Sequence, residues 1–246
     1  MNIVVLMAGD GKRFSERGYK IAKPFIEVNG KSILFRTLDS LPQIRNKKYD
    51  TLTFAIRSEH DVYRETIKNY YGDDVNFVVF EKTTRGNLET AIKSLDYIKN
   101  DKPIIILDAD NQYDGSDVID YFQEKHNISH QFAGICYFSR IDDSIKWGFA
   151  ITKDDKVLEV IEKDYSAIEK NGSPMVGVFY FSSPSLFIKH ADRILRNKIF
   201  DKNEFYMTQS IKSIIQSGIP VYGLKVNNVI PLGTPEDIER IINEEP

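Results

Sequence analysis

A short apolar run that opens into a glycine-rich turn constrains this chain more than any other feature. Asn2 to Met7 is long enough for one buried strand, and the turn from Ala8 to Phe14 follows it directly. Gly9 and Gly11 lie in that turn, and because glycine has no Cβ, successive N–H groups can point toward one ligand. Concave arrangements of N–H groups bind phosphate. The turn therefore predicts a phosphate site, and its Lys12-Arg13 pair favours an oligophosphate.

The motifs that follow the turn give it a more specific meaning. The pattern is neither the G-x-G-x-x-G dinucleotide motif nor the P-loop. After Arg13 come nine residues, then Lys23-Pro24, the apolar stretch Phe25 to Val28 and a Gly30-Lys31-Ser32 turn. In this combination the chain resembles the nucleotidyltransferases that make sugar nucleotides. These are the sugar-nucleotide pyrophosphorylases, or sugar-1-phosphate nucleotidylyltransferases, and the related capsule-type cytidylyltransferases. Gly18-Tyr19 resembles a subgroup from capsule and cell-surface glycan clusters.

Composition and charge exclude several other classes of protein. The 246 residues, 41% hydrophobic and 28% charged, allow one large α/β domain with a sizeable core. A formal net charge of -3 predicts no nucleic-acid partner. We expect no membrane partner and a cytoplasmic location, because no apolar run approaches membrane-spanning length and the chain starts without a signal-peptide pattern. Cys136 is expected to be a core residue. The oligomeric state stays open, with a homo-oligomer as one option.

The pattern of apolar runs predicts one continuous mixed sheet. In the first half, strands are expected at Asn2–Met7, Phe25–Val28, Thr51–Ile56, Val75–Phe80 and Pro103–Leu107, and helices at Ser32–Leu41, Ser58–Tyr71 and Gly86–Ile98. Ser32 and Ser58 are expected to cap their helices. In the second half, strands are expected at Gln131–Ser139, Gly148–Thr152, Val157–Glu162, Met175–Phe181 and Pro220–Val226, and helices at Pro184–Leu195, Glu204–Gln216 and Pro235–Ile242.

Strand–helix alternation over the first 110 residues predicts a doubly wound sheet. The family resemblance implies the corresponding fold, a Rossmann-like α/β/α sandwich of the glycosyltransferase-A type with a mixed, mostly parallel central sheet. We expect a single nucleotidyltransferase domain over residues 1–246. Its nucleotide-binding half would span about residues 1–112 and its acceptor-binding half about residues 113–246.

Two carboxylates follow the predicted strand at Pro103–Leu107. Ligands in open α/β sheets bind beyond the carboxyl ends of the strands, where Asp108 and Asp110 would lie. Mg²⁺ prefers oxygen ligands and shares them with phosphates. The family resemblance implies that Asp110, followed by Asn111, holds Mg²⁺ between the nucleotide and the acceptor phosphate, with Asp108 as the second candidate. A turn capped by Asp and Asn is the alternative.

Four further motifs resemble the family and imply roles for their residues. The loop that includes Arg85 and Gly86 would contact the nucleotide, at a helix start that favours anions. Trp147-Gly148 resembles a turn that approaches the acceptor. Glu162-Lys163 resembles a Glu-Lys-Pro motif in which the Glu contacts the sugar and the Lys its phosphate, although Asp164 replaces the Pro here. Gly177 lies in a strand that resembles an Asn-x-Gly-x-Tyr motif.

The end of the chain departs from the family pattern. Leu232 to Asp237 resembles an ending in which an Asp two residues before the Gly is a second metal ligand, but Pro231 occupies that position here. Either Asn228 or Asp108 compensates for it, or Asp110 and the phosphates hold the metal. Locally, Thr234 is expected to cap the last helix and Pro235 to begin it.

The resemblance implies that a nucleoside triphosphate (NTP) reacts with a phosphomonoester to give an NDP-linked product and pyrophosphate. Arg13, Lys23 and Asp110 would be the catalytic residues, because the protein must mainly position phosphates and stabilise charge. The predicted nucleotide-binding residues are Ala8, Gly9, Gly11, Lys12, Arg13, Lys23, Arg85, Gly86 and Asp108, and the predicted acceptor-binding residues are Trp147, Gly148, Glu162, Lys163 and Gly177.

Two other functions remain open at the level of the sequence. The acceptor could be a non-sugar phosphate of the phosphocholine or phosphoglutamine type, used by a cytidylyltransferase. The lost Pro after Lys163 and the lost Asp at Pro231 fit that alternative. The other alternative is a glycosyltransferase-like or regulatory protein that binds a nucleotide without releasing pyrophosphate. Arg13 and Lys23 argue against it, because their charges serve pyrophosphate release. The nucleobase and the acceptor are not specified.

Overall fold

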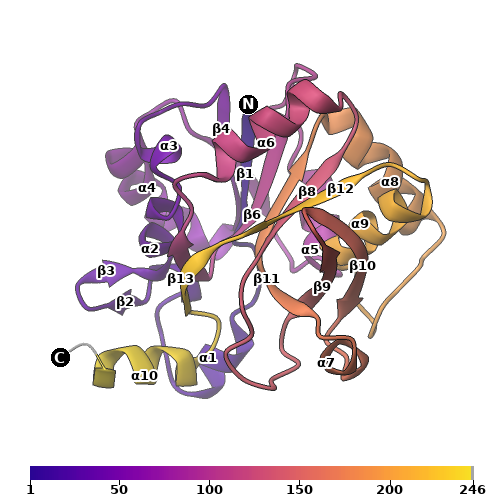
Figure 1. Cartoon of the computed structure of the whole chain (residues 1–246). Coiled ribbons are helices and arrows are strands. Elements are labelled where there is room, and N and C mark those ends of the chain that lie inside the picture. Colours follow the sequence, from indigo (N-terminus) through magenta and orange to yellow (C-terminus); the bar gives the residue numbers. More distant parts are fainter. Residues whose placement is uncertain (245–246) are drawn as a thin grey trace.

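The computed structural model describes residues 1–244, and its centre is a mixed sheet of nine strands in the order β5-β4-β1-β6-β11-β8-β12-β10-β9 (Figure 1). The strands are β1 (Asn2–Leu6), β4 (Thr51–Arg57), β5 (Asn76–Phe80), β6 (Ile104–Asp108), β8 (Ala133–Tyr137), β9 (Gly148–Lys153), β10 (Lys156–Glu162), β11 (Ser173–Phe181) and β12 (Val221–Lys225). From the strand pairings, β10 and β11 run against the other strands. The sheet is therefore mixed and mostly parallel, as predicted, and strands from both halves of the chain share it.

Helices cover both faces of this sheet. The helices are α1 (Lys12–Glu16), α2 (Ile33–Asp39), α3 (Pro42–Arg45), α4 (Arg64–Tyr71), α5 (Asn87–Lys93), α6 (Val118–Ile128), α7 (Ser166–Glu169), α8 (Pro184–Arg196), α9 (Met207–Gln216) and α10 (Pro235–Glu244). Figure 1 shows α2, α3 and α4 on one side of the sheet and α8 and α9 on the other. This arrangement confirms the predicted α/β/α sandwich. No helix within residues 1–244 has both the length and the apolar character needed to cross a membrane.

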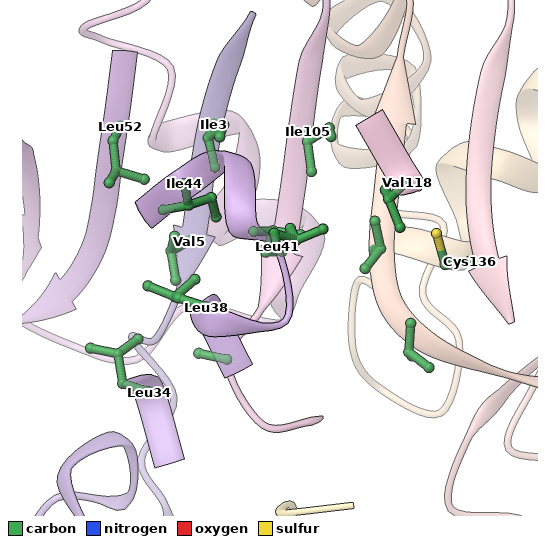
Figure 2. Packing of buried hydrophobic residues seen from close by; sticks show 14 of the residues in the cluster. Ile3, Val5, Leu34, Leu38, Leu41, Ile44, Leu52, Ile105, Val118 and Cys136 are labelled. Atoms are coloured by element: carbon green, nitrogen blue, oxygen red, sulfur yellow. The ribbon is translucent and has the colours of Figure 1, made fainter. Parts of the chain in front are cut away.

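Alternation along β1 divides the core into two layers. Successive side chains of a strand point to opposite faces. Ile3 and Val5 accordingly join a cluster beneath α2, α3, α4 and α6, whereas Val4 and Leu6 join a cluster beneath α5, α8 and α9. Figure 2 shows Ile3 and Val5 packed against Leu38 and Ile44 in the first layer. Cys136 is buried in this layer, as expected. Because β1 is buried on both faces, its sequence after Asn2 is an uninterrupted apolar run from Ile3 to Leu6.

Two short two-stranded sheets bring distant segments to the edge where β1 and β6 end. The segment β7 (Asn111–Asp114) pairs with β13 (Asn227–Pro231), and β2 (Glu27–Val28) pairs with β3 (Lys31–Ser32). The chain leaves β13 for α10, which packs with α1 and β2 in a small third core. Figure 1 shows β13 crossing in front of the sheet toward α10. The last element of the chain is thereby placed beside the glycine-rich turn near its start.

Most of the predicted elements are present, with a few errors. The helix α6 was missing from the prediction, although Val118, Ile119 and Phe122 form a buried stripe at helical spacing. Ser58 does not cap a long helix, because a 3-10 segment (Ser58–Tyr63) comes first and α4 begins only at Arg64. Of the apolar stretch Phe25 to Val28, Phe25 ends a second 3-10 turn (Lys23–Phe25), and only Glu27–Val28 forms a strand.

The predicted cap residues at two helices are confirmed. The Ser32 hydroxyl accepts from the Phe35 N–H at 3.3 Å and so caps α2. Before α10, the Thr234 hydroxyl accepts from the Asp237 N–H at 3.2 Å, and the Asp237 carboxylate accepts from the Thr234 N–H at 3.0 Å. This reciprocal pair fixes the direction in which α10 leaves the sheet.

Candidate active site

Two adjoining cavities lie where β1 and β6 end. One has a volume of about 770 Å³ and the other about 260 Å³. The strands β1 and β6 are parallel and in register, with Leu6 opposite Asp108, so the glycine-rich turn and the two carboxylates leave the sheet at the same edge. The residues that line both cavities are Arg13, Lys23, Asn87, Asp108, Asp110, Lys163 and Gly233. Two ligands bound in the two cavities would meet at this shared wall.

The larger cavity brings together the residues predicted to bind a nucleotide. Its lining includes all nine of them, namely Ala8, Gly9, Gly11, Lys12, Arg13, Lys23, Arg85, Gly86 and Asp108. Gly11 adopts a left-handed conformation with φ of 60° before α1. A Cβ on Gly11 would lie 3.4 Å from the Cβ of Lys23, so the turn packs closely against the segment that presents the lysine. Glycine at this position serves both the backbone conformation and the close approach.

The loop before α5 is held mainly by the protein itself. The Arg85 guanidinium pairs with Glu89, with contacts of 2.9 and 3.1 Å, and the Arg85 N–H donates to the same carboxylate at 2.8 Å. Gly86 has φ of 136°, and a Cβ there would lie 2.3 Å from the Phe205 carbonyl oxygen. Gly86 therefore allows the loop to pack against the segment before α9. Contact of Arg85 and Gly86 with a nucleotide stays a prediction.

Lys23 and Asp110 form an ion pair on the wall that the two cavities share. The Lys23 Nζ lies 2.7 Å from the Asp110 Oδ2, and both side chains are partly buried. The Asn111 amide donates to the Asp110 Oδ1 at 3.0 Å and to the Val176 carbonyl at 3.2 Å. Each Asp110 oxygen thus has a partner that fixes its direction. The Lys23 ammonium and the Asp110 carboxylate are therefore both fixed on the shared wall, where the phosphates of two bound ligands would meet.

Asp108 lies deeper than Asp110 and has few compensating contacts. Burial, and then the neighbouring charge of Asp110, raises the pKa of the Asp108 carboxyl to about 7. The Asn87 amide approaches its Oδ1 at 3.5 Å. Gly177, with φ of 79°, makes room for it, because a Cβ there would lie 2.7 Å from the Asp108 Oδ2. Two neighbouring carboxylates, one of them poorly neutralised, are a donor set that fits Mg²⁺ with phosphate oxygens as further ligands.

The smaller cavity contains the residues predicted to bind the acceptor. Its lining includes all five of them, namely Trp147, Gly148, Glu162, Lys163 and Gly177. Burial raises the pKa of the Glu162 carboxyl, and the Thr208 hydroxyl opposes this by donating to its Oε2 at 2.7 Å. A Cβ on Gly148 would lie 2.8 Å from Met175 and 3.0 Å from Glu162. Glycine at position 148 therefore leaves the space into which Glu162 projects.

Lysine ammonium groups lie over two of the three aromatic rings that line the smaller cavity, those of Tyr206 and Trp147. The Lys163 Nζ lies 4.2 Å from the centre of the Tyr206 ring, and the Lys146 Nζ lies 5.1 Å from the Trp147 ring. Lys163 also lies 3.7 Å from Glu162 and has a left-handed backbone with φ of 48°. Its N–H donates to the Trp147 carbonyl at 2.9 Å, which ties β10 to the turn before β9. These contacts fix the position of Lys163, which lines both cavities and so forms part of their shared wall.

The environment of Pro231 bears on the alternatives for the missing carboxylate. Pro231 is paired with Asn111, beside Asp110, so the position does border the site. Asn228 lies three residues earlier in β13 and is exposed, and the lining of neither cavity includes it. Asp108 lines both cavities. Of the two residues considered, Asp108 is the one placed to compensate.

Several residues of the site were given no role in the sequence analysis. They are Asn87, Asn111, Lys146, Tyr206, Thr208 and Asp237. The Asn87 side chain bridges two segments. Its Oδ1 accepts from the Met207 N–H at 2.9 Å, and its Nδ2 faces Asp108. Only its place directly after Gly86 could have pointed to it. Tyr206 and Thr208 come from the start of α9, a position that the periodicity of the chain does not distinguish.

Comparison with known proteins identifies the family and agrees with this fold. A sequence profile described as Nucleotidyl transferase matches residues 2–228, and the chain belongs to this family. It is 24% identical over 243 residues to the UTP–glucose-1-phosphate uridylyltransferase AglF of Haloferax volcanii, covering 96% of this chain and 93% of that protein. It is 23% identical over 244 residues to the bifunctional protein GlmU of Methanococcus vannielii, covering 97% of this chain and 53% of that protein. The chain thus spans about half the length of the bifunctional relative.

Solved structures show the same fold at low sequence identity. The nucleoside-diphosphate-sugar pyrophosphorylase from Vibrio cholerae superposes with a TM-score of 0.81 at 18% identity, covering 99% of this chain and 100% of that one. The inositol-1-phosphate CTP transferase from T. maritima superposes with a TM-score of 0.72 at 14% identity, covering 99% and 95%. The family resemblance inferred from the glycine-rich turn and the Lys-Pro motif is confirmed, and so is the fold.

Proposed function

We propose that this chain transfers a nucleoside monophosphate from an NTP to a phosphorylated small-molecule acceptor, a sugar 1-phosphate, and releases pyrophosphate. The observation that carries the proposal is the pair of adjoining cavities with Lys23, Asp108 and Asp110 on their shared wall. The NTP occupies the larger cavity, formed mostly by residues 1–112, and the acceptor occupies the smaller one. The names of the similar proteins, which specify sugar nucleotides, support the same class of reaction. The product would serve capsule or cell-surface glycan synthesis.

The reaction asks the protein to position phosphates rather than to form a covalent intermediate. An oxygen of the acceptor phosphate forms a bond to the α-phosphorus, the bond from that phosphorus to the bridging oxygen breaks, and pyrophosphate leaves with the electron pair. Lys23 stabilises the charge at the α-phosphate, and Arg13 and Lys12 hold the departing pyrophosphate. Lys163 orients the acceptor phosphate from the other side of the shared wall. Correct alignment of the two phosphates lowers the entropic part of the barrier.

Asp110 and Asp108 are the residues that would hold Mg²⁺. When bound, the ion supplies positive charge that offsets the repulsion between the two phosphate groups. Lys23 is held 2.7 Å from Asp110, so this cation remains beside the residues that would hold the metal. Asn111 keeps the Asp110 carboxylate in a fixed orientation through its 3.0 Å hydrogen bond.

The contacts within the smaller cavity favour a hydroxyl-bearing acceptor. A quaternary ammonium such as choline is bound by open aromatic faces. Here the ammonium groups of Lys163 and Lys146 already lie over Tyr206 and Trp147 and would repel a second cation. Glu162, held by Thr208, instead offers a buried acceptor for sugar hydroxyl groups. A sugar phosphate therefore suits this cavity better than phosphocholine.

A cytidylyltransferase with a non-sugar acceptor is the second candidate. The observation that favours it is Pro231, which borders the site where the resembling family has an aspartate. The inositol-1-phosphate CTP transferase with the same fold supports this direction as well. Pyrophosphate release from each of the four NTPs with a panel of sugar phosphates, polyol phosphates, phosphocholine and phosphoglutamine would separate the two candidates.

The Lys23→Ala variant tests the central assignment. The Lys23 ammonium and a phosphate oxygen would form a charge pair that is partly removed from solvent. Losing one partner of such a pair costs about 2–5 kcal/mol, so single-turnover pyrophosphate release should fall by about two to three powers of ten. NTP affinity, measured by calorimetry, should fall less, because charge moves toward Lys23 mainly in the transition state. Lys20→Ala, an exposed lysine of the same loop that lines neither cavity, is the matched control. Wild-type rates in Lys23→Ala would favour a nucleotide-binding protein without this chemistry.

A further inference from the structure

Lys146 is a cation of the smaller cavity to which the predicted roles assign no task. It precedes Trp147 in the segment that leads into β9, and it lines the smaller cavity but not the larger one. Its Nζ lies 2.8 Å from the Oδ1 of Asp237, in the first turn of α10. Asp237 is 7% exposed, so the ion pair is largely removed from solvent on one side. A lysine that is only structural has no need to border a substrate cavity.

Gly233 places this ion pair beside the reacting end of the site. A Cβ on Gly233 would lie 3.5 Å from the Asp110 Oδ2 and 3.8 Å from the Asp237 Oδ2, so both carboxylates face the space that the missing side chain leaves. Lys146 therefore enters the cavity on the side of Asp110. Lys163 lies beside Glu162 and Tyr206 instead. The two lysines thus lie at different parts of the cavity wall, Lys146 beside Asp237 and Lys163 beside Glu162.

The ion pair with Asp237 leaves Lys146 free to bind a second anion. An ammonium group has three N–H donors, and Asp237 needs one of them. Asp237 also accepts from the Thr234 N–H at 3.0 Å and lies in the first turn of a helix, where a negative charge is favoured. It therefore stays well compensated if Lys146 shares its charge with a ligand. The pair holds the ammonium in place without using up its hydrogen-bonding capacity.

We propose that Lys146 binds the phosphate of the acceptor, together with Lys163, and that Asp237 positions it for this purpose. This inference rests on the proposed function. A phosphate monoester carries close to two negative charges at neutral pH, and charge-assisted hydrogen bonds from two ammonium groups match that charge. Where the resembling family places a carboxylate, this chain has Pro231, so the wall beside Asp110 has one negative charge fewer to oppose the phosphate.

The test compares Lys146→Met with wild type in steady-state kinetics. Methionine keeps the apolar stem and removes the charge. The Michaelis constant for the acceptor should rise by about ten- to a hundredfold, the range of a lost charge-assisted hydrogen bond, while that for the NTP stays within about twofold. The inhibition constant of inorganic phosphate, measured in competition with the acceptor, should rise by a similar factor. Lys146→Arg should restore most of both losses.

Two further variants separate this role from a structural one. Asp237→Asn keeps the cap of α10, because the amide oxygen still accepts, and should raise the acceptor constant less than Lys146→Met does. Lys153→Met, at the exposed end of β9, is the control and should change neither constant. Equal effects of Lys146→Met and Asp237→Asn on both substrates would show a simple link to α10 and overturn the proposal.

Failure of the proposed function would look different from failure of this inference. If wild type releases no pyrophosphate with any phosphorylated acceptor, the proposed function fails, and the role of Lys146 fails with it. If wild type turns over and Lys146→Met keeps the wild-type acceptor and phosphate constants, only the assignment of Lys146 fails.

Discussion

Asp110 is the residue whose surroundings are most completely specified in the site. Lys23 occupies one of its oxygens and Asn111 the other, and its backbone carbonyl accepts from the Leu232 N–H at 2.9 Å. These three contacts join the segment that presents Lys23, the start of β7 and the segment before α10 at one residue. A carboxylate held in this way has a fixed orientation toward a cation beside it. Its negative charge should therefore matter more for activity than the shape of the side chain.

We expect Asp110→Asn to lose at least about a hundredfold in turnover, because a metal contact contributes several kcal/mol to charge stabilisation. The amide preserves the shape of the side chain, so the melting temperature should stay close to that of wild type. Turnover as a function of Mg²⁺ concentration, together with thermal melting, checks both statements. Asp114→Asn, in the neighbouring β7 and lining neither cavity, is the control. Unchanged turnover in Asp110→Asn would contradict the metal assignment.

Gly177 offers a sharper test of how closely Asp108 is packed. Gly177 and Gly218 have nearly equal φ values, 79° and 78°, but a Cβ would lie 2.7 Å from Asp108 at the first and would contact nothing within 4 Å at the second. Both Gly→Ala changes share the backbone strain of about 1–2 kcal/mol. Gly177→Ala should lose about 1–3 kcal/mol more in the free energy of unfolding, and its activity as well. Equal losses in denaturant unfolding would mean that Asp108 can move away.

At the scale of elements, the sequence predicted what depends on local pattern and missed what depends on packing. The strand β1 could be recognised because burial on both faces makes it an apolar run, and Ser32 and Thr234 because a cap acts on its own helix. The two-residue strands β2 and β3 are too short for a periodic signal. Gly86 was predicted as a nucleotide contact from its motif. Its close packing against the Phe205 backbone, where a Cβ would not fit, could not be predicted, because Phe205 lies more than a hundred residues further along the chain.

The same distinction applies to the residues of the site. Lys23 and Asp110 belong to motifs that can be recognised along the chain. The ion pair of Lys146 with Asp237 joins residues 91 positions apart, and the hydrogen bond of Thr208 with Glu162 joins residues 46 apart. Glu162 and Asp237 belong to recognisable motifs, but Thr208 and Lys146 carry no local pattern, so only the folded chain shows these contacts.

The start of α5 gives a pH-dependent prediction at this scale. Glu89 is 5% exposed and is bound by Arg85 and Lys93, and the Arg85 hydrogen bonds contribute most to lowering the pKa of its carboxyl to about 2. The unfolded chain has the ordinary value of 4.5, so the unfolded state binds the proton more readily. The stabilisation is therefore complete above about pH 5 and is lost as the pH falls through 4.5 toward 2.

Between pH 7 and pH 3 this carboxyl should account for about 1 kcal/mol of the free energy of unfolding, roughly half of the value that the full pKa shift would give, because Arg85 and Lys93 are half-exposed and solvent screens the contacts. Glu89→Gln removes the titrating group, so its stability should be lower at pH 7 and should depend less on pH by that amount. Urea unfolding at several pH values between 3 and 7 measures the difference. Glu65→Gln, an exposed carboxylate on α4, provides the comparison. Parallel pH profiles of wild type and Glu89→Gln would contradict the prediction.

At the scale of the whole molecule, one sheet carries two binding cavities side by side. The strands β1 and β6 bring the glycine-rich turn and the carboxylates to the larger cavity, while β9, β10 and β11 bring Gly148, Glu162 and Gly177 to the smaller one. Because the two cavities share lining residues at one sheet edge, ligands bound in them would lie next to each other. Residues far from the shared wall should therefore affect the Michaelis constant of one substrate, and residues on it should affect the turnover number as well.

Three variants test this division by the Michaelis constants of the two substrates. Lys12 lines only the larger cavity, Glu162 only the smaller one, and Lys163 both. Lys12→Ala should raise the constant for the NTP by about threefold, because its side chain is 72% exposed and an exposed charge contact is worth less than 1 kcal/mol. Glu162→Gln should raise the constant for the acceptor by about tenfold or more, because a buried hydrogen bond to a charged group is lost.

Lys163→Ala is the variant that tests the shared wall itself. Its ammonium lies over Tyr206 on the acceptor side, yet it also borders the larger cavity, so the acceptor constant should rise most and the turnover number should fall with it. The constant for the NTP should change by less than about threefold, because the charge acts on the reacting phosphates rather than on the base. Initial-rate measurements over a grid of both substrate concentrations give both Michaelis constants and the turnover number. Equal rises of both constants in Glu162→Gln and in Lys12→Ala would mean that the two cavities act as one site, and the division of the chain into two halves would have to be given up.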